Sequence, residues 1–348
     1  MYRKTTALLV MALLIPALML TGCGDKKDKA VDTIAGGGPA GTAAETPDTR
    51  DLVRSPLTGE LVPRESLARR PLAVMVENSP AARPQSGLDK ADLVYEMLAE
   101  AAITRFMAVY LHSEAAVLGP VRSARPYFIT RALDYDAIYA YSGGSEAAKK
   151  MVRTEQVAAL DEFGIGRRAF WRIKGRNAPH NLYTDTAKLR KVSAEKGYKQ
   201  FSEITPFKFL AEGEALSGGR SSAGPIIYYP RDFSVAAFEY DQSQNHYLRA
   251  TGGRPHKDNV TGEQLTVRNI IVQYVNTKVI DKEGRRSMKM TGSGRALLFT
   301  GGQVYEGRWH KSGLRFRTVF TGENGTEFKL NPGRTWISVV PIDTKVDY

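Results

Sequence analysis

Arginine residues gather around one glycine-led turn in front of an expected helix. Residues 119–125 read Gly-Pro-Val-Arg-Ser-Ala-Arg, and Arg83 and Arg105 precede them near the ends of apolar runs. The start of a helix leaves backbone N–H groups free, and a guanidinium offers two parallel donors, so this pattern predicts a site for a carboxylate or phosphate group. The ligand-binding residues expected there are Arg83, Gln85, Arg105, Arg122, Ser123 and Arg125.

The same arginines have carboxylates that could pair with them instead. Glu96, Glu100 and Asp92 would then hold them as structural ion pairs, and this alternative stays open. The position of these polar residues at strand ends favours a ligand crevice, because open α/β sheets bind their ligands there. If the protein is an enzyme, its acid–base groups would be Glu77, Glu96, Glu100 and His180.

Two histidine motifs add possible donors or bases. His180 and Asn181 follow a proline in a loop, and His256 and Asp258 form a comparable pair later in the chain. Such a histidine can act as a base or a donor, or simply bond to its own loop. No single element carries metal-ligand spacing, and a shared metal would need the two halves to pack face to face. We therefore expect neither a metal nor a cofactor.

Residues 142–145 read Ser-Gly-Gly-Ser, and Gly143 and Gly144 could bind an anion through backbone N–H groups. Neither a phosphate-binding Walker loop nor a nucleophile elbow is present. Ser145 is better placed as a helix cap than as a nucleophile, although it stays in the predicted ligand set. Residues 167–172 mix arginines with Phe170 and Trp171, which fits either a surface that holds sugars or anionic polymer, or a solvated loop.

The first residues predict export and lipid attachment. Arg3 and Lys4 precede an apolar run that ends in Leu20-Thr21-Gly22-Cys23, and Cys23 is the one cysteine in the chain. A basic start, a short apolar core and small residues are typical of a signal peptide, and the final tetrapeptide looks like a bacterial lipobox. We expect a lipoprotein signal peptide over 1–22 and acyl groups, palmitate among them, on Cys23. An ordinary signal peptide with an accidental cysteine is the alternative.

Composition and pattern divide the rest of the chain. Residues 23–69 are rich in Gly, Ala and Pro and predict a flexible tether, in which 55–61 forms a turn against the folded part. Residues 70–212 alternate strand-like runs with helical patterns and predict an α/β layer domain. Past a Gly/Ser-rich break, residues 213–348 predict a smaller, mostly antiparallel β-rich domain, a small sandwich or barrel.

The chain has 348 residues and a formal net charge of +12, from 49 Lys and Arg against 37 Asp and Glu. Such an excess is compatible with nucleic-acid binding. An exported protein meets no chromosomal DNA, so the charge points instead to anionic wall polymer or lipid headgroups. The expected location is the extracytoplasmic face of the cell membrane, held in the bilayer by the acyl groups of Cys23.

Several motifs together resemble the YerB-type lipoproteins, a family defined by a domain of unknown function (DUF3048). The matching segments are 73–78, 82–88, 91–96, 103–105, 119–125, 143–145, 178–183, 253–258, 292–295 and 330–336. The resemblance covers about 70–342 and implies two family domains in the order given above. It implies no activity.

Two functions follow as expectations. The first is a binding protein that holds a cell-envelope component, whether anionic wall polymer, glycan or partner protein, through an arginine-rich cleft. The second is a hydrolase or transferase acting on wall material with Glu77 and His180 as acid and base. The feature that separates them is whether His180, Glu77 and Arg122 come within hydrogen-bond reach of one another in one cleft.

Overall fold

The computed structural model describes residues 51–348. The predicted signal peptide, Cys23 and most of the expected tether lie outside these residues. Regular structure is already present before Arg70, where the composition places the start of the folded part. Strand β1 (Leu52–Arg54) pairs antiparallel with β2 (Leu61–Pro63), and Leu57 between them is completely buried. Burial of this turn offsets the entropy of ordering it.

An eleven-stranded mixed sheet forms the centre of the structure, and its first-half strands lie together at one end. They are β4 (Leu93–Leu98), β5 (Thr104–Tyr110), β3 (Leu72–Glu77), β6 (Ile138–Tyr141) and β7 (Ala159–Asp161), in that order across the sheet. The first four are buried along their whole length. Both of their faces are therefore covered, which explains why they read as unbroken apolar runs in the sequence.

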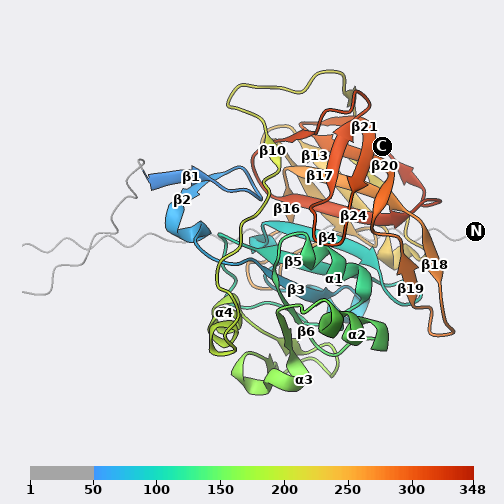
Figure 1. Ribbon diagram of the computed structural model, residues 1–348. Helices are drawn as coiled ribbons and strands as arrows, with labels where there is room; N and C mark the ends of the chain where they lie inside the picture. The colour runs from blue at the N-terminus through green and yellow to red at the C-terminus, as the bar shows by residue number, and fades with distance from the viewer. Residues whose placement is uncertain (1–50) are drawn as a thin grey trace, which may run out of the picture. The chain divides into compact units, whose positions relative to one another are not determined.

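Strands from the second half continue the same sheet (Figure 1). They are β24 (Thr335–Pro341), β17 (Asn269–Val275), β20 (Gly292–Thr300), β21 (Gln303–Lys311), β11 (Arg220–Ser221) and β22 (Val319–Gly322). The junction is a parallel pairing of β24 with β4, in which Trp336 lies opposite Val94. The second half therefore does not close a sandwich or barrel of its own; its longest strands extend the first-half sheet.

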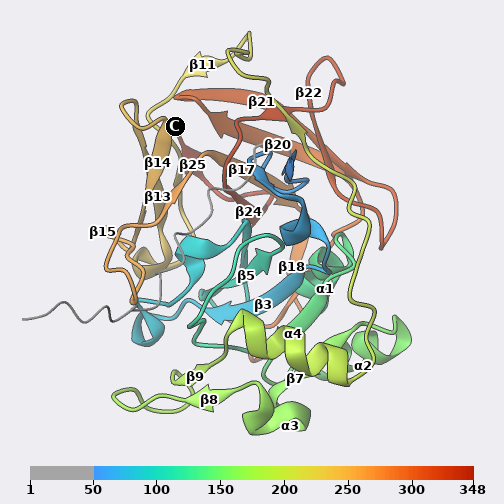
Figure 2. The same cartoon turned by 90° about the vertical axis from the view of Figure 1, so that its left-hand side faces the viewer.

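Six more strands of the second half form an antiparallel sheet, seen at the left of Figure 2. Its members are β15 (Arg254–Pro255), β14 (His246–Thr251), β13 (Ala236–Asp241), β12 (Ile226–Ile227), β25 (Val346–Asp347) and β16 (Thr266–Val267). Buried and less buried residues alternate along β14, the pattern of a strand with one face toward the core. The fold is thus a mixed α/β first half and a mostly antiparallel second half, as predicted.

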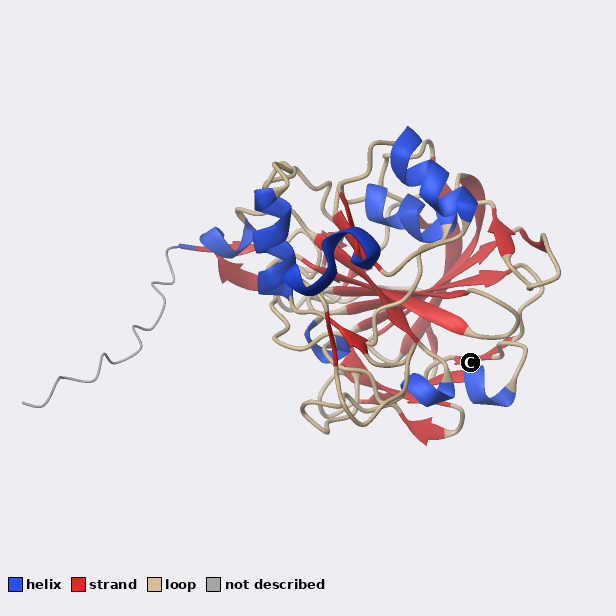
Figure 3. Ribbon diagram, turned by 90° about the horizontal axis from the view of Figure 1, so that it is seen from below, coloured by secondary structure: helices blue, strands red, loops and turns tan. Residues whose placement is uncertain are grey.

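The helices belong to the first half and lie beside the central strands (Figures 1 and 3). They are α1 (Pro126–Leu133), α2 (Glu146–Thr154), α3 (Glu162–Ile165) and α4 (Thr186–Glu195). Ser145, Asp161 and Asp185 cap the last three through their side chains. None of the helices within residues 51–348 has the length and apolar character needed to cross a bilayer.

Three further short pairs complete the structure. They are β10 (Lys208–Phe209) parallel to β23 (Lys329–Leu330), β18 (Thr277–Val279) antiparallel to β19 (Arg286–Met288), and β8 (Trp171–Arg172) antiparallel to β9 (Leu182–Tyr183). The apolar and basic run 314–320 is strand-like in the sequence, but β22 begins only at Val319. A turn containing Gly301 and Gly302 joins β20 to β21, and both glycines have positive φ.

Candidate functional site

Glu77, the last residue of β3, is the centre of a small polar cluster. Its side chain is 3% exposed. Its Oε1 accepts a hydrogen bond of 2.7 Å from Ser79 Oγ, and its Oε2 lies 2.9 Å from His180 Nδ1. Arg122 completes the cluster as an ion pair, with Nε 3.3 Å from the same Oε2. The structure thus places His180 and Arg122 at the same oxygen of Glu77, but of these three residues only Arg122 lines the cleft described below.

The loop between β8 and β9 carries His180 to this place. His180 N donates to Asn177 O within the loop, and Ile173 N donates to Asn181 O across its base. Arg176 ties the loop to the segment that follows β3 by donating to Ala82 O and Pro84 O, each at 2.7 Å. These bonds fix the histidine against a carboxylate 103 residues earlier in the chain.

Arg122 is held beside β3 by its backbone. Arg122 N donates to Met75 O, and Glu77 N donates to Pro120 O. Burial lowers the pKa of the Arg122 guanidinium; Glu77 acts in the opposite direction, and the neighbouring charge of Arg105 lowers the pKa further. Arg122 Nε is buried and meets Glu77 only as an ion pair, and neither Nη atom donates a hydrogen bond to any residue in 51–348. A bound anion would therefore stabilise this charge.

A cleft of about 620 Å³ opens beside Arg122. This volume lies within the range of about 300–1,000 Å³ common for small-ligand sites. Its lining consists of Val121, Arg122, Ser123, Ser142, Gly143, Gly144, Lys149, Asp161, Phe163, Arg172, Pro179 and Leu182. Glu77 and His180 are absent from that lining, so Arg122 is the residue that joins the cluster to the cleft.

The glycine-rich segment 142–145 forms one wall of the cleft, but its groups are partly engaged. Gly143 N donates to Asp161 Oδ1 at 2.9 Å, and Ser142 N donates to Arg122 O. Ser145 Oγ accepts from Ala148 N as the cap of α2, as its position predicts. Gly143 and Gly144 therefore shape the cleft more than they supply donors to it.

Arg105 and Arg125 are held by a carboxylate away from the cleft lining. Arg105 Nη2 lies 2.5 Å from Glu100 Oε2, and Arg125 pairs with the other oxygen of Glu100. Asp92, in contrast, accepts bonds from the segment after β5, among them Ser113 Oγ at 2.6 Å. For Arg105, Arg125 and Glu100 the arrangement is that of a structural ion pair, the alternative left open by the sequence.

Glu96 lies in a second, fully buried network. Its Oε2 accepts from Arg249 Nη2 at 2.8 Å and from Trp336 Nε1 at 3.0 Å. The Arg249 guanidinium lies 4.4 Å from the centre of the Trp336 ring and also donates to His256 Nδ1. His256 Nε2 in turn donates to Gln85 Oε1 at 2.6 Å. This network joins first-half and second-half residues in the core.

The remaining predicted residues also have structural partners. Arg83 Nε donates to Asn78 Oδ1, and its Nη1 donates to Phe233 O in the second half. Asp258 accepts from Gly87 N and Val260 N. Within residues 51–348, no group of three or more His, Cys, Asp and Glu side chains is arranged to hold a metal ion.

Three of the cleft residues, Lys149, Asp161 and Phe163, were not predicted from the sequence. Arg172 belongs to the segment 167–172, which the sequence left open as a surface for sugars or anionic polymer. It also lines the cleft, and its Nη1 donates to Asn181 Oδ1 at 2.9 Å. The side-chain oxygen of Asn181 therefore holds Arg172 in place and is not free for a ligand. One signal was available: Asp161 and Phe163 lie between a strand and a glycine, at the end of β7, where an α/β sheet places its ligands.

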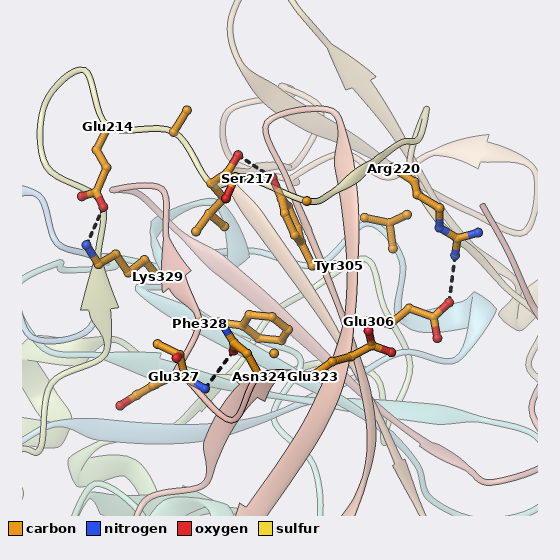
Figure 4. A pocket seen from close by; sticks show the side chains of 16 residues that line it. Glu214, Ser217, Arg220, Tyr305, Glu306, Glu323, Asn324, Glu327, Phe328 and Lys329 are labelled. Atoms are coloured by element: carbon orange, nitrogen blue, oxygen red, sulfur yellow. Dashed lines mark hydrogen bonds and ion pairs between the residues drawn. The ribbon is translucent and has the colours of Figure 1, made fainter.

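A second cleft, of about 660 Å³, lies between the 214–220 segment and strands of the second half (Figure 4). Most of its charges are neutralised in pairs. Glu214 pairs with Lys329, Arg220 Nη2 lies 2.8 Å from Glu306 Oε1, and Glu327 pairs with Arg317. With so few free groups, this cleft is a weaker candidate than the one beside Arg122.

Comparisons with known proteins agree with one another. The chain matches the domain described as "Protein of unknown function (DUF3048) N-terminal domain" over residues 57–199 and the corresponding C-terminal domain over 226–337. It is 35% identical over 296 residues to the "Putative lipoprotein YerB" of Bacillus subtilis (strain 168), covering 85% of this chain and 88% of that protein. The crystal structure of the YerB protein from Bacillus subtilis matches with a TM-score of 0.78 and 34% identity, over 85% of this chain and 100% of that one.

Proposed function

Because the chain belongs to the DUF3048 family, whose description carries no activity, we propose its function from its own residues: a lipid-anchored envelope protein that binds an anionic wall polymer or glycan in the cleft beside Arg122. The observation that carries the proposal is that neither Nη atom of the Arg122 guanidinium donates a hydrogen bond to any of residues 51–348, while its Nε is paired with Glu77 Oε2. Arg172 and Lys149 line the same cleft; each also pairs with a glutamate outside the lining, Glu162 and Glu146, and Asp161 is the one carboxylate within it. The lining itself therefore carries more positive than negative charge.

Lipid anchoring is supported by two independent features. The chain has a Leu-Thr-Gly-Cys segment after an apolar run, with its one cysteine at Cys23, and its relative from Bacillus subtilis is named as a lipoprotein. Two or three acyl chains hold a protein firmly at a bilayer, where one chain does not. Fatty-acid labelling of the full-length chain should mark the wild type and not C23S, and C23S should leave the membrane fraction. Equal labelling of both would contradict the anchor.

Binding is tested with purified full-length chain and anionic wall polymer of known phosphate content. We expect R122A to weaken binding roughly 10- to 100-fold, because a charge-assisted hydrogen bond to an anion is lost. R122K should recover part of the affinity, since lysine keeps the charge but not the paired donors. R254A, at an exposed arginine of β15, is the matched control and should bind like the wild type.

Two outcomes would argue against the proposal. If R122A binds the polymer with wild-type affinity, Arg122 takes no part in binding. Unfolding of R122A, seen as a large fall in its thermal midpoint, would instead assign Arg122 the scaffold role of holding Glu77.

A second candidate function is hydrolysis, favoured by the contact between Glu77 and His180. An ionised carboxylate only accepts hydrogen bonds, so the ring proton of a neutral His180 lies on Nδ1 and Nε2 keeps its lone pair. A histidine oriented in this way can take a proton from water. The test is release of soluble fragments from wall polymer. E77Q and H180A should both abolish it, and release by H180A at the wild-type rate would exclude this function.

A further inference from the structure

Phe163 has the most exposed large apolar side chain among the residues that line the cleft, with 81% of its surface open to solvent. Its ring lies on the backbone of Gly143, since a Cβ added there would be only 2.8 Å from Phe163 Cε2. One side of the ring therefore rests on the chain while the rest faces solvent. Exposure of a phenylalanine costs free energy, which contact with a ligand would recover.

An oriented hydrogen-bond acceptor lies two residues before this ring. Asp161 Oδ1 accepts from Gly143 N at 2.9 Å and from Phe163 N at 3.3 Å, which fixes the carboxylate at the end of β7. Its Oδ2 makes no hydrogen bond within the part of the chain that the structure describes. Asp161 lines the same cleft as Phe163, so this oxygen is available to accept from a ligand hydroxyl.

We propose that the ligand of this cleft is a glycan whose sugar ring packs on Phe163, donates a hydroxyl to Asp161 Oδ2 and carries a phosphate or carboxylate that binds Arg122. The apolar C–H face of a sugar ring suits an aromatic face, while its hydroxyl edge needs acceptors such as a carboxylate. A phospholipid headgroup would satisfy Arg122 but would leave the ring of Phe163 uncovered. This inference rests on the proposed function and specifies its ligand class.

The experiment compares two soluble probes with the same number of phosphates. One is an oligomer of N-acetylglucosamine 1-phosphate, and the other is an oligomer of glycerol phosphate, which reproduces lipid-headgroup chemistry without a sugar. Full-length chain in non-ionic detergent is titrated with each by calorimetry at one fixed ionic strength, since equal phosphate charge then gives equal electrostatic attraction. The measured quantity is the ratio of the two dissociation constants.

We expect the wild type to prefer the sugar oligomer, and F163A to reduce that preference by about 2- to 12-fold, the range of a well-placed aromatic contact. F163Y keeps the ring and should keep the preference. F316A removes a phenylalanine that is 65% exposed but lies outside the cleft lining, so it should match the wild type. Because Phe163 is so exposed, F163A should unfold at the wild-type temperature.

The inference is overturned if the wild type binds both oligomers equally, or if F163A keeps the full preference. The proposed function fails differently. If R122A binds both oligomers as the wild type does, anion binding at Arg122 is wrong even where F163A reduces the preference. If R122A loses binding of both oligomers and F163A has a reduced preference for the sugar oligomer, the result supports the proposed function and the inference together.

Discussion

The buried pair of Arg249 and Glu96 gives the sharpest test of the structure. Arg249 comes from β14 in the second half and Glu96 from β4 in the first, and both side chains are fully buried. The substitution R249M keeps a long apolar side chain beside the Trp336 ring and removes the charge. Glu96 is then left in the core without its cationic partner.

The expected cost follows from what remains around the carboxylate. Removing one partner of a buried ion pair costs about 3–5 kcal/mol, because the other charge stays buried. Glu96 keeps hydrogen bonds from Trp336 Nε1 at 3.0 Å and Thr104 Oγ1 at 2.9 Å, which places the loss in the lower part of that range, about 3–4 kcal/mol. E96Q alone should also be costly, since it leaves Arg249 unpaired. The double variant has no buried charge and should be more stable than the sum of the single losses by about 2 kcal/mol.

Urea unfolding followed by tryptophan fluorescence measures these free energies, and Trp336 reports directly because its ring stacks on Arg249. The single variants should lower the midpoint without changing the slope. A loss below about 1 kcal/mol in R249M, or strictly additive losses in the double variant, would refute the assignment of this network to the core and reopen Glu96 as a chemical group.

Three further predictions concern pH, one glycine and the shared sheet. Burial, with the charges of Arg249 and Arg83, holds the pKa of His256 well below its usual value, so below about pH 6.5 only the unfolded state gains the proton. The free energy of unfolding should therefore decrease by about 1.4 kcal/mol for each unit by which the pH is lowered. Urea titrations of the wild type and H256Q from pH 7 to pH 5 isolate this slope, and identical slopes in the two proteins would disprove it. G143A should lower the free energy of unfolding by about 1–2 kcal/mol, measured by thermal unfolding, because Gly143 has a φ of 63°. Since the added Cβ displaces the Phe163 ring, G143A should also lose the preference for the sugar oligomer. A chain ending at residue 212 should fail to fold, because β4 loses its partner β24 and Glu96 loses Arg249. A sharp monomer peak in size-exclusion chromatography, together with a native-like circular dichroism spectrum, would contradict this.

Some residues of the site can be predicted from the sequence. The 119–125 turn, Glu77 and His180 were identified as chemical residues, and the structure brings Arg122, Glu77 and His180 into contact. The ion pairs of Glu100 were foreseen only as an alternative, because sequence spacing does not show which charges meet. Phe163 was missed, since an apolar residue on a four-residue helix is expected to be buried.

The sequence by itself determined the local elements of this protein. Apolar runs and capping residues predicted the alternation of strands and helices over residues 70–212, where β3, β4, β5, α1, α2 and α4 lie, because strand and cap preferences act over a few neighbouring positions. The predicted export signal rests on the same kind of short-range pattern.

Only the tertiary structure decided which of the predicted chemical residues share a site. Glu77 and His180 are 103 residues apart and Glu96 and Arg249 are 153 apart, and β24 joins the two halves into one sheet by pairing with β4. Contacts over such separations depend on how whole elements pack, which local preferences do not encode. For that reason the sequence could not show that His256 and Gln85 lie bonded to each other in the core, or that Arg122 lies beside a cleft with donors free.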